Sequence, residues 1–483
     1  MRRYPSLLVA VLVVLSIVVV SLVPAGTATG QAPVPTEGSA LSAAQAAGVV
    51  FLPMSMRDYP RLPTTLGLQM HSISAGNGFS LAAQTSAYWV RYNAFDWNAI
   101  EPRRTDPPTY LWSAVYEASL INAAHAGMQV IATVKFTPSW ARKVSSSSCS
   151  AVRADAFDEY AQFLTALVRR YSAAPYNVRY WELGNEVDVD PSEVPSNSGF
   201  GCWGDINDYY YGGGFYAEML KVAYPAIKAA DPRAQVMLGG LLMDCDPTQS
   251  AGQRCERSRF LEGVLRAGGA PYFDILSFHG YVLFNGTLRL DIQHPGWVAR
   301  GGAVLGKIDF LREVLRNYGV SKPIMDTEGA LVCDPYNYSA CRPVGTAFYE
   351  AQADYVVWLY VRNWAEGLVG TVWYDFQDGG WRYSGLLDAN GTPRPAYFAF
   401  KFLGEELRGA TYRGRVDQYS GVAGYAFTQP GKRIWVLWTP DEVARTIALP
   451  AETLRVLDKY GNVIATGAGA LSLKSPVYVE LTP

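Results

Sequence analysis

Two glutamates stand at the ends of apolar runs in this 483-residue chain, far apart in sequence. Glu186 ends the segment WELGNE (181–186), and Glu328 ends the segment MDTE (325–328). Two carboxyl groups that face each other can cleave a glycosidic bond: one protonates the leaving oxygen, and the other attacks the anomeric carbon or activates water. The pair predicts this chemistry if the fold brings the two side chains together.

The chain around the glutamates must provide that geometry. Short β-rich runs alternate with amphipathic helical segments, which is typical of βα units around a parallel sheet. Eight such units fit an α/β fold of the closed (β/α)8 or TIM-barrel type, whereas the alternative, an open doubly wound sheet, lacks its Gly-rich turn after the first strand. The predicted strands are 65–72, 88–93, 128–135, 178–184, 235–240, 273–279, 323–327 and 370–375. The predicted helices are 114–126, 155–171, 215–230, 260–267, 308–318 and 348–366.

The pattern changes after residue 404. Runs at 422–428, 433–438 and 477–481 alternate apolar and polar residues, and YGN at 460–462 is a turn signal, so no helix is needed there. This part is predicted to be a small antiparallel β-sandwich domain. The expected organisation is a signal peptide at 1–30, a flexible lead-in at 31–60, a catalytic barrel at 61–405 and the β-domain at 406–483.

The ends of the barrel strands, where such enzymes carry their chemistry, resemble glycoside hydrolase clan A. Asn185-Glu186 after the fourth strand, with Glu328 at the end of the seventh, is the pattern that carries the resemblance, and it extends over the whole barrel. The chain is family 39-like or family 5-like, except that Gly184 stands where those families usually have Trp, which is similar to the arabinofuranosidase families. The resemblance implies a retaining glycosidase with Glu186 as acid/base, Glu328 as nucleophile, and carboxyl groups ~5–5.5 Å apart.

The same resemblance implies further contacts. Arg91 on the second strand would support the nucleophile, and Asn185 would hold the 2-hydroxyl of the sugar. His279 and Tyr281 lie two residues apart on the sixth strand, so both face one side, and the tyrosine would contact the nucleophile. Trp373 on the eighth strand would form the floor of the sugar subsite.

Other candidates come from the residues alone. His71, at the end of the first strand, is expected to contact the substrate. Glu182 and Asp326 share strand parity with the two glutamates, so both are predicted to face the barrel interior as paired structural acids. Aromatic residues make up 13% of the chain and favour a sugar ligand, since sugar rings stack on them. Trp140 and Trp203, in long loops, are sugar platforms or members of small local cores.

Several other functions are excluded by composition and motifs. The four histidines are dispersed without metal-ligand spacing, so no metal is expected. GGAVLGK at 301–307 mimics a phosphate loop but lacks the following Ser or Thr and a preceding strand. A net charge of -2 without a basic stripe argues against nucleic acid as a partner. Two carboxylates and water suffice for the chemistry, so no cofactor is expected, and carbohydrate is the expected partner.

The N-terminus indicates export. Arg2 and Arg3 precede an apolar run at 7–23 and small residues at 24–30, as in a secretory signal; an uncleaved, outward-facing membrane anchor is the alternative. Six cysteines in an exported chain predict three disulfides, although fifteen pairings exist on paper. The close pairs are Cys245–Cys255 and Cys333–Cys341, which leave Cys149–Cys202 to join the loops after the third and fourth strands.

Two alternatives to a hydrolase remain. One is a noncatalytic carbohydrate-binding or cell-surface protein that has kept the barrel, because fold alone does not define function. The other is a transglycosidase, in which a sugar rather than water intercepts the intermediate. A protein that only binds need not keep both carboxylates together with Arg91, His279, Tyr281 and Trp373.

Overall fold

The computed structural model describes residues 64–248 and 255–483. The predicted signal peptide and lead-in, residues 1–60, lie outside the described residues. Within the described ranges, no helix has both the length and the apolar character needed to span a membrane.

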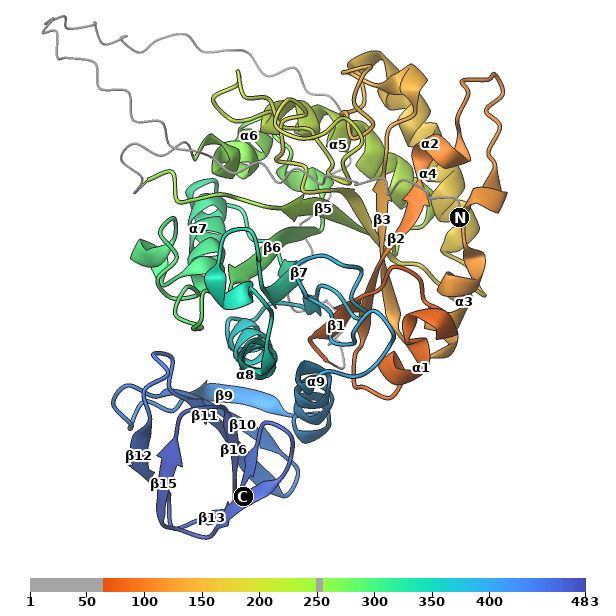
Figure 1. Ribbon diagram of the computed structural model, residues 1–483. Helices are drawn as coiled ribbons and strands as arrows, with labels where there is room; N and C mark the ends of the chain where they lie inside the picture. Colours follow the sequence, from red (N-terminus) through yellow and green to blue (C-terminus); the bar gives the residue numbers. More distant parts are fainter. Residues whose placement is uncertain (1–63, 249–254) are drawn as a thin grey trace, which may run out of the picture. The chain divides into compact units, whose positions relative to one another are not determined.

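Eight parallel strands close into a barrel in the order β1 to β8 (Figure 1). β1 pairs with both β2 and β8, which closes the circle and confirms the predicted (β/α)8 class. Every predicted strand is present, with its ends shifted by a few residues. The strands are β1 Leu66–Gln69, β2 Trp89–Asp96, β3 Gln129–Lys135, β4 Tyr180–Asn185, β5 Gln235–Leu241, β6 Ile275–Leu283, β7 Ile324–Val332 and β8 Thr371–Trp373.

Helices surround the barrel (Figure 1). They are α1 Phe79–Ala82, α2 Trp97–Ile100, α3 Glu117–His125, α4 Phe157–Tyr171, α5 Gly213–Ala230, α6 Phe260–Arg266, α7 Ala303–Asn317 and α8 Thr346–Ala365. α7 begins earlier than predicted because Gly301 and Gly302 have φ of 96° and 111° and reverse the chain before it. A Cβ on Gly302 would lie 2.2 Å from the Asp291 carbonyl oxygen, so the GGAVLGK glycines serve to start a helix.

The inner face of the barrel has an apolar half and a polar half. Trp89, Ile131, Met237, Ile275, Met325 and Val372 fill the N-terminal half of the strands. Side chains alternate along a strand, so the next inward-facing position lies two residues further on. There the interior becomes polar: Arg91 follows Trp89, and Thr133 follows Ile131. The apolar layer thus supports a polar layer at the C-terminal ends of the strands.

An extra residue interrupts β7. Phe278 of β6 pairs with Asp326, and the next residue, His279, pairs with Glu328, so Thr327 is left between the two pairs. A β-bulge of this kind shifts strand parity by one residue. Asp326 and Glu328 therefore point to opposite faces of the sheet, although they are two residues apart.

The bulge overturns the prediction for one of the two structural acids. Asp326 accepts a hydrogen bond of 3.1 Å from Asn363 on α8, in the helix layer, so the prediction that it faces the barrel interior is wrong. Glu182 does face the interior. It accepts hydrogen bonds from Arg91, at 2.6 Å, and from Thr133, at 3.1 Å, which confirms it as a paired acid.

The chain after the barrel folds mainly into antiparallel strands, as predicted. A six-stranded sheet has the order β14-β13-β16-β11-β10-β9, and β12 pairs with β15. The predicted YGN turn joins β13 to β14, with Gly461 at φ 92°. The strands are β9 Thr411–Arg415, β10 Ala423–Gln429, β11 Lys432–Trp438, β12 Arg445–Ala448, β13 Thr453–Asp458, β14 Val463–Thr466, β15 Ala470–Leu473 and β16 Val477–Leu481.

One helix before this sheet was not predicted. α9 Pro395–Glu406 starts with a proline, whose fixed φ suits the first helical turn, and buries Phe400 and Leu403. The predicted domain boundary at 405/406 falls at the end of this helix and remains a prediction.

All three predicted disulfides are present: Cys149–Cys202, Cys245–Cys255 and Cys333–Cys341. The first joins the loop after β3 to the loop after β4, and the other two each close one loop. Such bonds persist in oxidising compartments, which fits a protein that works outside the cytoplasm.

Candidate active site

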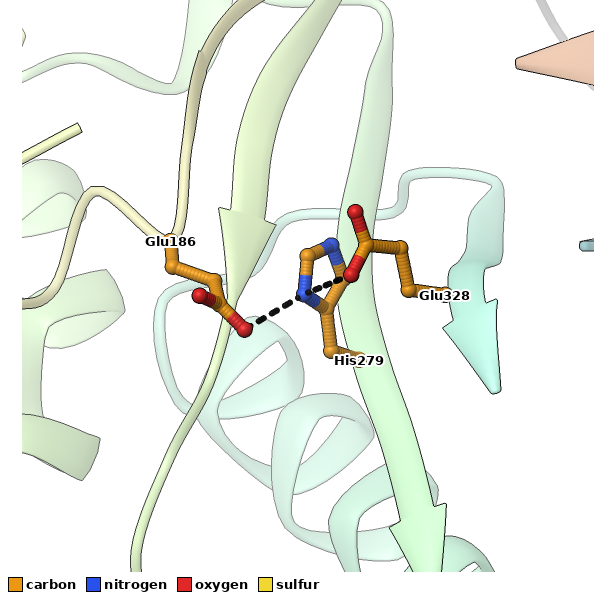
Figure 2. Close-up of side chains that lie close together, drawn as sticks. All are labelled: Glu186, His279 and Glu328. Carbon is orange, nitrogen blue, oxygen red and sulfur yellow. Dashed lines mark hydrogen bonds and ion pairs between the residues drawn. The ribbon is translucent and has the colours of Figure 1, made fainter. Parts of the chain in front are cut away.

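Three side chains, one from the residue that follows β4 and one each from β6 and β7, meet in the C-terminal half of the barrel (Figure 2). The His279 imidazole stands between two carboxyl groups: its Nδ1 lies 3.0 Å from Glu186 Oε1 and 3.5 Å from Glu328 Oε2. One oxygen of the Glu186 carboxyl group lies within 4.8 Å of one oxygen of the Glu328 carboxyl group. Glu186 is 7% exposed and Glu328 is 6% exposed, so both are largely shielded from water. The fold thus brings together the two glutamates that the sequence singles out.

The backbone around Glu186 leaves regular strand geometry. Gly184 has φ of 99°, and a Cβ at this position would lie 2.5 Å from Val187 Cγ1, so a tryptophan does not fit here without rearrangement. Glu186 itself has φ of 51°, which is uncommon for a residue with a side chain and typical of functional sites. The glycine that departs from the family 5 and 39 pattern therefore helps to set the direction of the Glu186 side chain.

Arg91 links the residues around Glu328. Its fully buried guanidinium donates hydrogen bonds to Glu182 at 2.6 Å, Asn185 at 2.7 Å and Gln69 at 3.1 Å, and it also donates to Glu328. The planar guanidinium presents several donors in a fixed geometry, so one side chain orients all four acceptors. Gln69 was not predicted as a member of this group; its only sequence signal is its place at the end of β1.

His279 and Tyr281 both reach Glu328, as expected for residues on one face of β6. The Tyr281 hydroxyl donates a hydrogen bond to Glu328 Oε2. Burial alone would raise the pKa of Glu328, but the His279 imidazole, the Arg91 guanidinium and the Tyr281 hydroxyl hold it below its ordinary value. The pKa of His279 is raised, because the two carboxylates outweigh the opposing effect of burial.

This arrangement is suited to proton transfer more than to metal binding. Glu186, His279 and Glu328 offer ligand atoms close enough for a cation. However, both oxygens of Glu328 already accept hydrogen bonds, from Arg91 and Tyr281, and His279 Nδ1 contacts Glu186. Arg91 already pairs with Glu328, and its positive charge opposes a second cation on that carboxylate.

His71 lies at the barrel mouth, two residues beyond β1. Its Nε2 is 3.0 Å from Asp375 Oδ2, and this hydrogen bond raises the pKa of His71. The edge of the imidazole faces the Tyr374 ring at 6.1 Å between centroids. The His71 side chain is 42% exposed, so a ligand can reach it, and its contact with the substrate stays a prediction.

Trp373 does not occupy the predicted place. It is 0% exposed, its Nε1 donates to the Ser384 carbonyl at 2.9 Å, and its ring lies 6.4 Å from that of Tyr355 on α8. The side chain faces the helix layer, so it has no access to a sugar in the barrel. The prediction that Trp373 forms the floor of the sugar subsite is wrong.

Two neighbouring aromatic residues lie at the mouth instead. The Tyr281 ring is 6.0 Å from Tyr374 and 4.9 Å from Trp381, and the latter two rings are 5.4 Å apart. This three-ring cluster adjoins Glu328 through the Tyr281 hydroxyl. Tyr374, which belongs to this cluster, directly follows Trp373 in the sequence.

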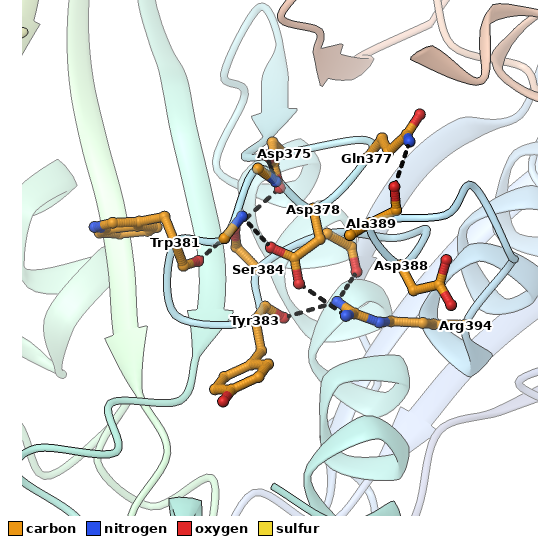
Figure 3. Close-up of polar contacts among 12 residues, drawn as sticks. Asp375, Gln377, Asp378, Trp381, Tyr383, Ser384, Asp388, Ala389 and Arg394 are labelled. Carbon is orange, nitrogen blue, oxygen red and sulfur yellow. Dashed lines mark hydrogen bonds and ion pairs between the residues drawn. The ribbon is translucent and has the colours of Figure 1, made fainter. Parts of the chain in front are cut away.

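A polar network organises the loop after β8, and the Trp381 carbonyl joins it by accepting a hydrogen bond from Ser384 Oγ at 3.0 Å (Figure 3). Asp375 accepts hydrogen bonds from Ser384 Oγ at 3.0 Å and from the Gly379 amide at 3.1 Å. Arg394 donates to Asp378 at 2.8 Å and to the Gly385 carbonyl at 2.9 Å. Figure 3 shows the Trp381 ring extending from the opposite side of the loop to Arg394.

Two loop tryptophans lie apart from the carboxyl groups. Trp140 donates through Nε1 to the Glu101 carbonyl at 3.0 Å and packs edge-on against Trp97, so its contact with substrate stays a prediction. Trp203 is buried against Phe157 and its neighbours, in a small local core.

No protein-family model and no curated protein matches the chain. Solved structures do match it. A family 39 glycoside hydrolase from the gut symbiont Bacteroides cellulosilyticus WH2 is 19% identical, with a TM-score of 0.64 over 87% of this chain and 81% of that one. A GH30 endoxylanase from Clostridium papyrosolvens C71 is 13% identical, with a TM-score of 0.56 over 88% and 97%. AbfB, a family 51 α-L-arabinofuranosidase from Bifidobacterium longum, is 11% identical, with a TM-score of 0.55 over 88% and 96%.

At these identities the likeness shows the fold. The chain has the barrel fold shared by glycoside hydrolases of families 39, 30 and 51, which confirms the resemblance to clan A at the level of fold.

Proposed function

We propose that this protein is a retaining glycoside hydrolase that cleaves O-glycosidic bonds of an oligo- or polysaccharide by double displacement. The observation that carries the proposal is the pair Glu186 and Glu328, which meet across His279 at the C-terminal end of the barrel. The fold shared with known glycoside hydrolases supports it independently.

Glu328 is the nucleophile. Its lowered pKa keeps it ionised, and hydrogen bonds from Arg91 and Tyr281 hold its two oxygens in place. A fixed carboxylate needs little reorganisation before it attacks the anomeric carbon, which lowers the barrier. The attack forms a glycosyl ester on Glu328 and breaks the bond to the leaving oxygen.

Glu186 is the acid/base. It gives its proton to the leaving oxygen in the first step and takes a proton from the attacking water in the second. Its hydrogen-bonding partner His279 also lies near Glu328, so the same imidazole interacts electrostatically with both carboxyl groups. Asn185 has its Oδ1 bonded to Arg91, which orients its amide to donate to the 2-hydroxyl of the sugar.

The spacing of the carboxyl groups favours retention. Inverting enzymes separate the two groups by ~6.5–9.5 Å to admit a water, whereas retaining enzymes hold them ~5–5.5 Å apart. An oxygen of Glu186 lies within 4.8 Å of one on Glu328, and this close approach supports the shorter spacing.

The proposal is tested with a panel of nitrophenyl β-xylosides, β-glucosides and α-arabinofuranosides. The wild-type protein should release nitrophenol from at least one of them, and NMR should show that the first sugar product keeps the anomeric configuration of the substrate. Glu328→Gln is the matched inactive control. A folded wild-type protein that hydrolyses none of them would exclude these specificities and favour the noncatalytic alternative, and an inverted product would contradict the double displacement.

A further inference from the structure

Lys135 is the last residue of β3 and lies at the same end of the barrel as the two glutamates. Burial lowers its pKa to about 8 and Arg91 adds to this effect, while the carboxylates Glu328, Glu186 and Asp96 oppose it. The same ammonium also acts on His71. The Gly199 carbonyl, which accepts a hydrogen bond from Lys135 Nζ at 3.4 Å, also accepts one from Asn185 Nδ2 at 3.5 Å, so the ammonium lies next to Asn185. The proposed mechanism does not use Lys135.

The surroundings of Lys135 leave its hydrogen-bonding capacity largely unused. An ammonium has three donors. Among the described residues, Nζ of Lys135 has one acceptor, the Gly199 carbonyl at 3.4 Å, and no carboxylate within ion-pair distance; the Phe136 ring covers one side at 4.8 Å. The side chain is only partly buried, so a ligand in the mouth can reach the remaining donors.

A second lysine shows what a structural ammonium looks like in this fold. Lys307 on α7 is buried, and its Nζ donates to the Leu242 carbonyl at 2.6 Å and to the His279 carbonyl at 2.9 Å. Its donors are matched by backbone acceptors, as expected for a buried polar group. Lys135 has a single, longer contact of this kind, to the Gly199 carbonyl at 3.4 Å, and it shares that acceptor with Asn185.

We propose that Lys135 binds a ring hydroxyl of the sugar in the active site and thereby determines which sugar is accepted. The inference rests on the proposed hydrolase and names a specificity residue for it. A charge-assisted hydrogen bond from an ammonium to a hydroxyl is stronger than a neutral one, and a sugar lacking that hydroxyl would leave the remaining donors of Lys135 desolvated without an acceptor. Enzymes reject analogues most strongly in this way.

The test combines Lys135→Met with substrates that each lack one hydroxyl. On the best nitrophenyl glycoside, the variant should lose roughly 10- to 100-fold in kcat/KM, as expected for one hydrogen bond to a charged group. Removal of one particular hydroxyl should cost the wild-type enzyme a similar factor and should cost the variant almost nothing. Lys143→Met is the matched control, because Lys143 lies in the loop after β3, is exposed and pairs at 3.7 Å with Asp205; its kinetics should stay unchanged.

Several results would overturn the assignment. Equal penalties for every missing hydroxyl in wild type and variant would show that Lys135 contacts none of them. If Lys135→Met shifts the acid side of the pH profile of kcat/KM, and no missing hydroxyl affects wild type and variant differently, Lys135 acts electrostatically on Glu328 instead of binding a hydroxyl. The wild-type enzyme could instead prefer a substrate with a carboxylate in place of the hydroxymethyl group. If Lys135→Met loses that preference, Lys135 recognises an acidic sugar, and the proposed hydroxyl contact is wrong.

Folding is controlled separately. If Lys135→Met has a lower melting temperature, Lys135→Cys followed by aminoethylation restores an ammonium, and the hydroxyl dependence should return with it. If the wild-type protein turns over no glycoside, the proposed function fails. The binding role is then tested by calorimetric titration of D-xylose, D-glucose and L-arabinose into the wild-type protein and into Lys135→Met. The role is rejected if the variant binds these sugars as tightly as the wild type, or if the wild type binds none of them.

Discussion

Glu186, the residue that follows β4, and Glu328, within β7, face the same site, but the surrounding residues hold them differently. Glu328 on β7 has both oxygens bonded, by Arg91 and Tyr281, with His279 nearby. Among the described residues, Glu186 has one side-chain hydrogen bond, to His279, and it lies on backbone with φ of 51°. A nucleophile must stay ionised and fixed, whereas an acid/base must change its protonation state in every cycle. The unequal support fits that division of labour.

Removing the more firmly held carboxylate should have the largest effect. Glu328→Ala eliminates the group that forms the covalent bond, so kcat on an activated glycoside should fall on the order of 10⁴-fold or more. Steady-state kinetics with a nitrophenyl glycoside measures this. A decrease of less than about tenfold would mean that Glu328 is not the nucleophile.

Removing the less firmly held carboxylate should affect one half of the cycle more than the other. In Glu186→Ala a good leaving group still departs without acid help, but deglycosylation loses its base, so steady-state turnover should fall about 10²- to 10⁴-fold. Stopped-flow kinetics should show a burst of nitrophenol equal to the enzyme concentration. Slow release of nitrophenol without a burst would mean that the substitution slows formation of the glycosyl-enzyme more than its hydrolysis, which contradicts the prediction.

Arg91 connects the two strand ends and should matter for stability as well. Arg91→Met leaves Glu182 buried without its cationic partner, which should lower the free energy of unfolding by about 3–5 kcal/mol. Urea denaturation at neutral pH measures the change. The control is Arg170→Met, which removes an exposed ion pair with Glu117 and should cost about 0–1 kcal/mol. Equal effects of the two substitutions would show that the Arg91 network does not stabilise the fold.

The smallest expected effect concerns pH. Because the pKa of Glu328 is lowered, the carboxylate stays ionised, and the enzyme active, further into acid than an ordinary glutamate would allow. Tyr281→Phe removes one hydrogen bond to the ionised form, so the pKa should rise and the acid limb of kcat/KM should move up by roughly one pH unit. The pH profile of the variant measures this shift. If the acid limb of the variant does not move, the Tyr281 hydroxyl does not lower the pKa of Glu328.

Regular alternation made much of this fold predictable. The eight strands and six main helices follow from periodic apolar positions, and strand ends in a barrel converge by construction, so Glu186 and Glu328 could be paired from sequence. The disulfides follow from short spacings and from the adjacency of β3 and β4.

The failures lie where the backbone departs from that regularity. The bulge at Thr327 puts Asp326 and Glu328 on opposite faces of the sheet, which no count of alternating residues reveals. The assignment of Trp373 failed because β8 turns its last ring towards α8, whereas the next residue, Tyr374, packs against Tyr281. The sequence does not single out Lys135, because a single lysine at a strand end has no motif around it. Its significance depends on which acceptors surround it in space.

Azide rescue of both glutamate variants tests the division of roles most directly. In Glu328→Ala, azide can enter the cavity left by the nucleophile and displace the leaving group, giving a glycosyl azide of inverted configuration. In Glu186→Ala, azide attacks the glycosyl ester on Glu328 without needing a base, giving the retained azide. NMR of the two products reads the configuration. Inverted azide from Glu328→Ala and retained azide from Glu186→Ala are predicted; the reverse pattern, or full activity in either variant without azide, would contradict the account.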